Sequence, residues 1–408
     1  MQKKSIDSTL VFIVIALVIF GMIMISSVSV YPSFKITSRM VSQGLLPESN
    51  NYFYLSKNIA HVLVGLFSLM IFSKIPYFLF EKHVRPIFYG SLLALFLVLF
   101  IWVEYNGAKW WLSIPGLPSL QPVEFAKIGL ILFLAFFIKK RRSLLSDFSE
   151  GFVPFFLIAL LVFLLLAFQP DFWSILIIAP IVTALYFVAG GNIRYLIVSF
   201  LIGIMGAMGI YSLGKFSPSG WSSLHYISER IDNFFDKNEV LFEKGNDDGK
   251  IYQTKQGLLA IGSGGFFGLG FGKSIQKFGY LPEVQGDFIF SVIVEELWLF
   301  WAIILLSLYA TIVYRWFAIA RGVKDPFGKY TAFGITMLIL VQMFVNIGVN
   351  LNVIPLTGVT LPFVSYGGSS LISLLIATGI LLNISRYIEY PSKSDTYANI
   401  GQKRRIKI

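Results

Sequence analysis

The sequence contains no cysteine among its 408 residues, and charged residues make up only 13% of it. The missing cysteines exclude disulfide bonds, thiolate metal sites and a cysteine nucleophile, although they do not identify a compartment. A soluble domain has about a quarter of its residues charged, so the low value here indicates a protein solvated by lipid. Hydrophobic residues reach 56%, and 40 positions are phenylalanine, which agrees with that interpretation.

Long apolar runs predict the fold class. A run of about eighteen or more apolar residues is typical of a membrane-spanning helix. The first run is too long for the apolar part of a signal peptide and ends without a small-residue cleavage site, so we expect it to be retained. We therefore expect one all-α, polytopic membrane domain over residues 1–408, with ten transmembrane helices and one long extracytoplasmic loop at 214–287. The ten candidate spans are 9–30, 52–73, 86–103, 122–138, 153–168, 172–189, 193–213, 288–314, 330–351 and 361–384.

The distribution of lysine and arginine predicts the orientation. With the amino terminus in the cytoplasm, 20 of these residues fall on the inner side and 4 in the short outer connections. Loops longer than about 60 residues contribute little to the positive-inside rule, so the long loop is discounted. We expect both termini in the cytoplasm, including a basic tail at 387–408. The net charge of +11 then reflects membrane topology, and no nucleic acid is implied.

The long loop contains a glycine cluster, Gly262–Ser274, that invites comparison with nucleotide-binding motifs. A P-loop needs glycine five positions before the glycine of Gly-Lys-Ser, and that position is Phe267. The dinucleotide fingerprint also fails, because the glycine after Gly270 comes at the wrong spacing. We therefore expect no nucleotide. Two interpretations remain open: a flexible interfacial turn, or backbone N–H groups that hold a pyrophosphate.

Acidic residues lie where the long loop ends and the eighth span begins. Asp287 falls at the mouth of that span, where aspartate is a favoured helix N-cap. The alternative is a general base in a partly dehydrated cleft that faces the outer leaflet. Glu295 and Glu296 lie further into the same span, where charged residues usually face a cavity or a partner. We expect these two to be structural hydrogen-bond anchors.

Two further polar groups interrupt apolar spans. Glu124 and Lys127 are three residues apart, so they share one helix face and can form an ion pair. The pair is either purely structural or also lines a substrate cavity. The segment Ser365–Ser370 combines adjacent glycines with hydroxyl residues, which favours close helix packing. A polar cavity lining that includes Ser365 and Ser369 is the alternative.

Taken together, several segments make the sequence similar to the FtsW/RodA/SpoVE (SEDS) family, in order and over nearly the whole chain. The septal FtsW branch is favoured over the elongation RodA branch by Gln169–Phe172 and Leu382–Arg386. The segments that carry the resemblance are Asn106–Trp111 with Gln121–Lys127, Gln169–Asp171, Ala260–Glu296, and Ser365–Ser370 with Leu382–Arg386.

The resemblance implies a glycosyltransferase that polymerises lipid II, an undecaprenyl-pyrophosphate-linked disaccharide-peptide, into β-1,4 glycan on the outer face of the bacterial cytoplasmic membrane. It implies that Asp287 is the essential aspartate, which we expect to act as general base, and that Glu124 and Lys127 form a buried ion pair. Its expected partner is a class B penicillin-binding protein, a transpeptidase. A lipid II flippase and a scaffold for the transpeptidase are the alternatives.

The leaving pyrophosphate of such a reaction needs cationic stabilisation. We expect it from Arg230, Lys273 and Lys277, and a divalent cation, Mg²⁺ or Mn²⁺, is a candidate cofactor because such ions favour oxygen ligands. The sequence departs from the family pattern at three places. Gln285-Gly286 replaces a usual His-Thr, Trp110 a usual arginine and Trp298 a usual glycine. The first departure leaves open what the histidine and threonine contribute beside the aspartate.

Overall fold

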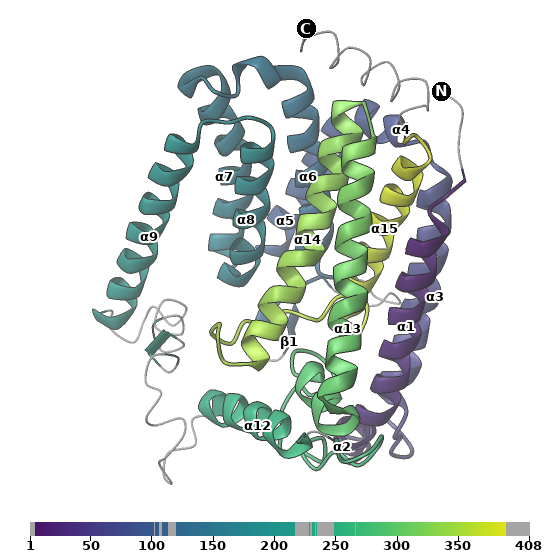
Figure 1. Ribbon diagram of the computed structural model, residues 1–408. Helices are drawn as coiled ribbons and strands as arrows, with labels where there is room; N and C mark the ends of the chain where they lie inside the picture. Colours follow the sequence, from purple (N-terminus) through teal and green to yellow (C-terminus); the bar gives the residue numbers. More distant parts are fainter. Residues whose placement is uncertain are drawn as a thin grey trace, which may run out of the picture.

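The computed structural model describes residues 5–101, 103–105, 108–112, 120–216, 228, 231–232, 234, 249–265 and 267–388. Within these ranges the protein is a bundle of long helices that run between two ends (Figure 1). Ten of the described helices correspond to the ten predicted spans. They are α1 (Ser8–Val28), α3 (Phe53–Lys74), α5 (Val84–Val98), α6 (Pro122–Arg141), α7 (Val153–Phe168), α8 (Phe172–Val188), α9 (Ile193–Phe216), α13 (Ile289–Gly322), α14 (Pro326–Asn350) and α15 (Gly368–Ser385).

Composition explains why these segments are helical. A helix satisfies its own backbone hydrogen bonds, which lipid cannot do. Seven of the described helices are long and apolar enough to cross a membrane, if α7 is counted with the π-helical turn Phe148–Phe152 before it. α5 and α8 are apolar but have only 15 and 17 residues. The predicted all-α membrane fold is confirmed, and the described strands are one short antiparallel hairpin, β1 (Val103–Tyr105) with β2 (Ala108–Trp111).

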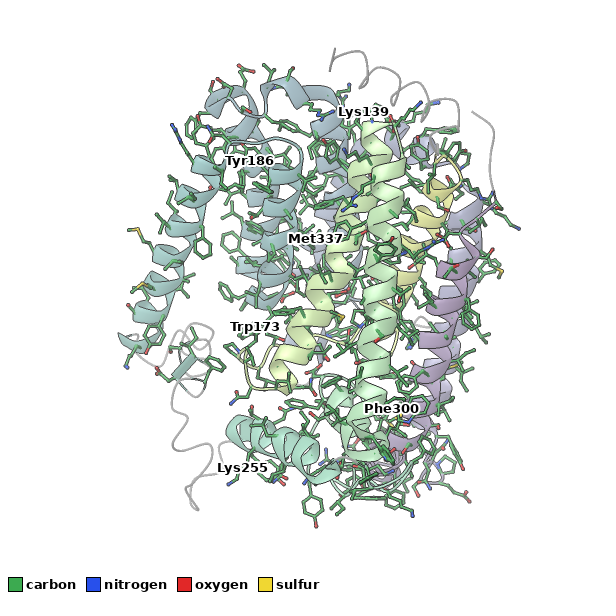
Figure 2. All side chains as sticks on the ribbon, viewed as in Figure 1. Lys139, Trp173, Tyr186, Lys255, Phe300 and Met337 are labelled. Atoms are coloured by element: carbon green, nitrogen blue, oxygen red, sulfur yellow. The ribbon has the colours of Figure 1, made fainter. Side chains whose placement is uncertain are left out.

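The two ends of the bundle hold different elements. At one end, called here the α12 end, α12 (Gly249–Gly264) and α2 (Val30–Ser42) lie beside the start of α13 (Figure 1). The opposite end, the α4 end, holds α4 (Tyr77–Lys82), the start of α1 and the end of α15. Figure 2 shows Lys255 at the α12 end and Lys139 at the α4 end. The orientation of these ends relative to the cytoplasm stays a prediction.

Small residues bring α3 and α15 close together in the interior. A Cβ at Gly379 would lie 2.8 Å from the carbonyl oxygen of Leu69, and one at Gly65 would lie 2.5 Å from a methyl carbon of Leu375. At Gly379 the neighbouring atom belongs to the backbone, so only glycine permits the two helices to approach so closely there. α9, in contrast, lies at the periphery, and most of its side chains are exposed.

Several boundaries and connections differ from the sequence prediction. The tenth span begins at Gly368 and not at residue 361, because the residues before it form a turn in which the Ser365 N–H donates to the Leu361 carbonyl at 3.0 Å. After α1 the chain continues as α2, a helix that lies outside the ten predicted spans. The described part of the long loop contains α12. All of the predicted tail except residues 387 and 388 lies outside the described residues.

Candidate active site

Asp287 lies at the α12 end, in the turn that precedes α13, and its side chain is partly buried. The N-cap alternative for this residue is wrong. The N-cap position of α13 is Phe288, which makes no side-chain capping hydrogen bond. The cap comes from another helix instead, because the Asn350 Oδ1 accepts from the Ser291 N–H at 3.0 Å and from the Ser291 hydroxyl at 2.7 Å.

The surroundings of Asp287 come from α14 and from the loop that follows it. The carbonyl oxygen of Asp287 accepts from the Nδ2 groups of Asn346 at 2.9 Å and Asn350 at 2.8 Å. The loop approaches the carboxylate at Gly358, where a Cβ would lie 3.5 Å from the Asp287 Oδ2. Sequence reasoning missed both asparagines. The available signal was an i, i+4 pair of amides inside an apolar span, where polar residues have functional or structural roles.

Backbone hydrogen bonds connect this segment to the start of α15. The Tyr366 N–H donates to the carbonyl of Gln285 at 2.8 Å, two residues before Asp287. The Ser365 hydroxyl accepts from the Leu361 N–H at 2.8 Å, so it stabilises the turn before α15. The segment Ser365–Ser370 therefore lies next to the Asp287 segment, although the two are far apart in the sequence.

This segment and the next turn of α15 also contact the start of α6. The Ser369 hydroxyl accepts from the Gln121 N–H at 2.9 Å, and the Ser373 hydroxyl donates to the Glu124 Oε2 at 3.5 Å. The Lys127 Nζ lies 2.8 Å from the Glu124 Oε1, and both residues are buried. The structure therefore contains the ion pair that their spacing predicts. A role for these residues in substrate binding stays a prediction.

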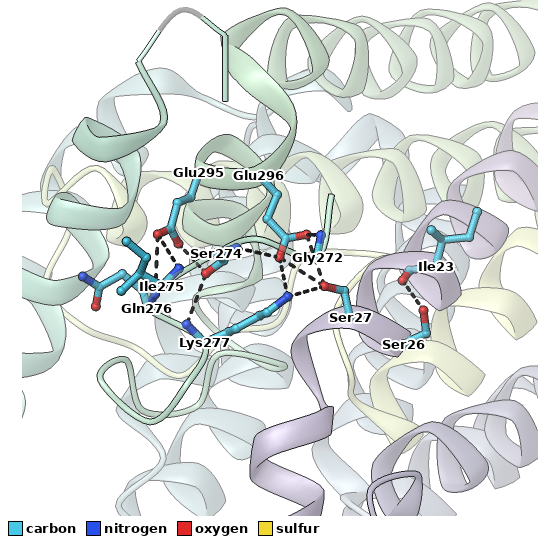
Figure 3. A network of polar contacts seen from close by, with 10 residues as sticks. All are labelled: Ile23, Ser26, Ser27, Gly272, Ser274, Ile275, Gln276, Lys277, Glu295 and Glu296. Carbon is cyan, nitrogen blue, oxygen red and sulfur yellow. Dashed lines mark hydrogen bonds and ion pairs between the residues drawn. The ribbon is translucent and has the colours of Figure 1, made fainter. Parts of the chain in front are cut away.

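The glycine cluster surrounds two buried carboxylates (Figure 3). Glu295 accepts from the Ile275 N–H at 3.0 Å and from the Ser274 hydroxyl at 2.5 Å. Glu296 accepts from the Gly272 N–H at 3.0 Å and from the Ser274 N–H at 3.3 Å. Both glutamates are therefore hydrogen-bond anchors, as expected. These N–H groups bind the protein's own carboxylates in this structure, which differs from the alternative in which they hold a pyrophosphate.

The helix is interrupted directly after these glutamates. Trp298 has φ 88° and ψ 157°, a conformation that glycine adopts almost exclusively. The carbonyl oxygens of Glu295 and Glu296 accept from the Leu269 and Gly270 N–H groups at 2.9 and 3.0 Å. The glycine cluster thus satisfies both the side chains and the backbone next to the break. The glycine that the family usually has at this position would adopt the same conformation without strain.

The three predicted pyrophosphate ligands differ in their surroundings. The Lys277 Nζ lies 2.8 Å from the Glu296 Oε1 and donates to the Ser27 hydroxyl at 2.8 Å, so it is buried in an ion pair. Lys273 is exposed on the same loop. Arg230 lies outside the described residues. The observed partner of Lys277 argues for a structural role, and pyrophosphate binding by Lys273 and Arg230 stays a prediction.

A divalent cation would need oxygen ligands. In the described ranges no group of three or more His, Cys, Asp or Glu side chains lies together in a metal-binding arrangement. Asp287 is therefore a candidate oxygen ligand, but among the described residues it does not belong to a cluster of metal-binding side chains. The cation stays a prediction for this site.

The family model described as a cell cycle protein, which covers FtsW, RodA and SpoVE, matches residues 8–390. The chain belongs to this family. Among its relatives, the stage V sporulation protein E of Bacillus subtilis strain 168 is 34% identical over 392 residues, covering 95% of this chain and 99% of that protein. The protein named probable peptidoglycan glycosyltransferase FtsW from the same organism is 37% identical over 412 residues, covering 98% and 96%.

Solved structures support the same assignment of the fold. The rod shape determining protein RodA of Thermus thermophilus superimposes with a TM-score of 0.65 at 28% identity, over 94% of this chain and 98% of that one. A chain from a structure described as a peptidoglycan synthase complex that coordinates polymerisation and crosslinking gives a TM-score of 0.72 at 27% identity, over 93% and 98%. This FtsW/RodA/SpoVE protein is therefore a bacterial membrane protein with a RodA-like fold.

Proposed function

We propose that this protein is a peptidoglycan glycosyltransferase that polymerises lipid II on the outer face of the cytoplasmic membrane. The observation that carries the proposal is the position of Asp287. A partly buried carboxylate lies at one end of a membrane bundle, between the start of α13 and the loop after α14. Relatives named probable peptidoglycan glycosyltransferase FtsW match nearly the whole chain, which supports the reaction type.

The reaction joins an α-linked glycosyl pyrophosphate to the 4-hydroxyl of an acceptor sugar. Asp287 accepts the proton of that hydroxyl while the hydroxyl oxygen of the acceptor sugar bonds to C1 of the donor. The bond from C1 to the pyrophosphate oxygen breaks, and undecaprenyl pyrophosphate leaves with the electron pair. A single displacement inverts the configuration at C1 and gives the β-1,4 link. A positioned general base contributes about a hundred- to ten-thousand-fold to such a rate.

Charge on the leaving group requires cations in the same place. Lys273, exposed beside the α12 end, and Arg230 are the proposed ligands of the pyrophosphate. Mg²⁺ or Mn²⁺ would supply further positive charge there. We assign substrate positioning to the buried Glu124–Lys127 pair of α6, to Ser369 of α15 and to Ser365 in the turn before α15.

The proposed partner is a class B penicillin-binding protein, since the family resemblance implies one and the similar chain from a synthase complex supports it. For orientation we propose that the α12 end is extracytoplasmic and that both termini are cytoplasmic. The bias of short-loop lysine and arginine residues, 20 against 4, supports this.

The decisive experiment supplies purified protein with lipid II, with and without the transpeptidase, and resolves the products on a gel. Glycan polymer should form in at least one of the two conditions. A parallel arm measures transfer of lipid II across vesicle membranes. Transfer without polymer would overturn the glycosyltransferase assignment in favour of a flippase, and neither activity would favour a scaffold.

A further inference from the structure

The carbonyl oxygen of Asp287 lies just outside α13, because the N-cap of that helix is Phe288. It therefore has no partner within the helix, and a buried carbonyl without a hydrogen bond costs free energy. Asn346 and Asn350 provide the partners, with Nδ2 to oxygen distances of 2.9 and 2.8 Å. Both lone pairs of one carbonyl are thus used by two side chains of a single helix.

The orientation of each amide is set by its partners. The second Nδ2 hydrogen bond of Asn346 goes to the Val359 carbonyl at 2.7 Å, and that of Asn350 goes to the Asn346 carbonyl at 2.9 Å. The Asn350 Oδ1 accepts from Ser291. Reversal of either amide would place oxygen against oxygen. Both side chains are buried, so water does not compete for these positions.

These bonds place three parts of the site relative to α14. Asn350 fixes the start of α13 through Ser291, both asparagines fix the backbone of Asp287, and Asn346 fixes the loop at Val359. Gly358, the residue that approaches the Asp287 carboxylate, is the neighbour of Val359 in that loop. One turn of α14 therefore holds both the backbone of Asp287 and the loop that lies beside its carboxylate.

We propose that Asn346 and Asn350 are positioning residues for Asp287 and hold its carboxylate in the geometry needed to accept a proton. This proposal rests on the proposed role of Asp287 as general base. The competing explanation is a purely structural one, in which the asparagines only cap α13 and fill the interior. The two explanations make different predictions for selected variants.

The variant Asn350→Asp separates capping from positioning. Its carboxylate still accepts from the N–H and hydroxyl of Ser291, and a negative charge at a helix N-terminus is favourable. It loses the donor to the carbonyls of Asp287 and Asn346 and places an oxygen against both of them. Asn346→Leu keeps the approximate volume but removes both donated hydrogen bonds of that residue. The matched control is Asn383→Leu, because Asn383 is also buried and bridges a backbone N–H of Tyr77 and the carbonyl of Ser73, at the α4 end.

The test is steady-state polymerisation of lipid II by the full-length variants, with the transpeptidase wherever the wild type needs it. Misplacement of a reacting group by about 1 Å can cost roughly a hundredfold in rate, so kcat should fall roughly ten- to a hundredfold in Asn346→Leu and Asn350→Asp with little change in KM. Hydrogen exchange of the peptide around Asp287 should rise in both. Asn383→Leu should lose stability while it keeps kcat and that exchange rate.

Failure of this proposal is distinguishable from failure of the proposed function. If Asp287→Asn is inactive while Asn350→Asp keeps wild-type kcat, the asparagines only cap and pack, and the positioning proposal is overturned. If Asp287→Asn itself polymerises at the wild-type rate, the general-base role falls, and positioning of Asp287 falls with it. The proposal would also be overturned if kcat changed by the same factor in Asn346→Leu and Asn350→Asp as in the control Asn383→Leu.

Discussion

The Nζ of Lys277 lies 2.8 Å from the Oε1 of Glu296, and 5% of the lysine side chain and none of the glutamate side chain is exposed. Ser27 of α1 hydrogen-bonds to both side chains. The pair therefore joins the first span, the glycine cluster and α13 in one buried network (Figure 3). Without the lysine, Glu296 would be a buried charge next to another buried carboxylate, Glu295.

A first prediction concerns the stability that this pair provides. Lys277→Met should destabilise the protein by about 3–5 kcal/mol, because removal of one partner leaves a buried charge uncompensated. Lys273→Met, on the exposed part of the same loop, should change stability by less than about 0.5 kcal/mol. Denaturant unfolding in detergent measures both. Equal effects in the two variants would show that the charge of Lys277 is not needed for folding.

A second prediction concerns Asp287. Asp287→Asn should lower the rate of lipid II polymerisation by about a hundred- to ten-thousand-fold, while the protein still inserts and binds the transpeptidase. No helix cap is lost, since the cap is supplied by Asn350. The matched control is Glu283→Gln, an exposed acid in the same segment, which should keep activity. Near wild-type polymerisation by Asp287→Asn would rule this residue out as the base.

A third prediction concerns the ion pair in α6. A double-mutant cycle with Glu124→Gln and Lys127→Met should give a strong coupling, because each single change leaves a buried charge that costs about 3–5 kcal/mol. The exposed pair Arg141–Glu150, at 3.5 Å, is the matched control. Exposed pairs contribute about 0–1 kcal/mol. Additive effects of the Glu124 and Lys127 substitutions would mean that their pairing does not stabilise the fold.

A fourth prediction tests the break in α13. At a helical position alanine is more stable than glycine by about 1 kcal/mol, but residues forced into the Trp298 conformation carry a strain of about 1–3 kcal/mol. Trp298→Gly should therefore be more stable than Trp298→Ala. Leu299, the next residue, supplies the control, because alanine should be the better substitution there. Thermal unfolding of the four variants decides the question, and alanine favoured at both positions would contradict the strained conformation.

The sequence predicted the helices well because lipid imposes a simple constraint. Apolar runs must be helical within the membrane, so the length of each run nearly gives the span. The error at the tenth span has a local cause, since Leu361–Ser365 is apolar but forms a turn stabilised by the Ser365 hydroxyl. α2 was missed because it lies outside the apolar runs from which spans were predicted.

The site was harder to predict than the spans. The spacing of Glu124 and Lys127 gave their pairing, because the two residues share a helix face. The partners of Glu296 could not be found in this way, since Ser27 is 269 residues distant in the sequence. The asparagines that bind the Asp287 carbonyl are 59 and 63 residues away from it. Such contacts depend on how helices pack, which the pattern of a single segment does not contain.

The close packing of α3 against α15 has a consequence for biosynthesis. α3 leaves the ribosome early, whereas the helix that fits against Gly65 is the last of the ten to be made. Until Asn383 has been translated, the Tyr77 N–H and the Ser73 carbonyl lack the side chain that bridges them in the finished protein. Insertion of spans and completion of the interior are therefore separate events. A chain that stops after α14 would lack both the helix that packs against Gly65 and the side chain that bridges Ser73 and Tyr77.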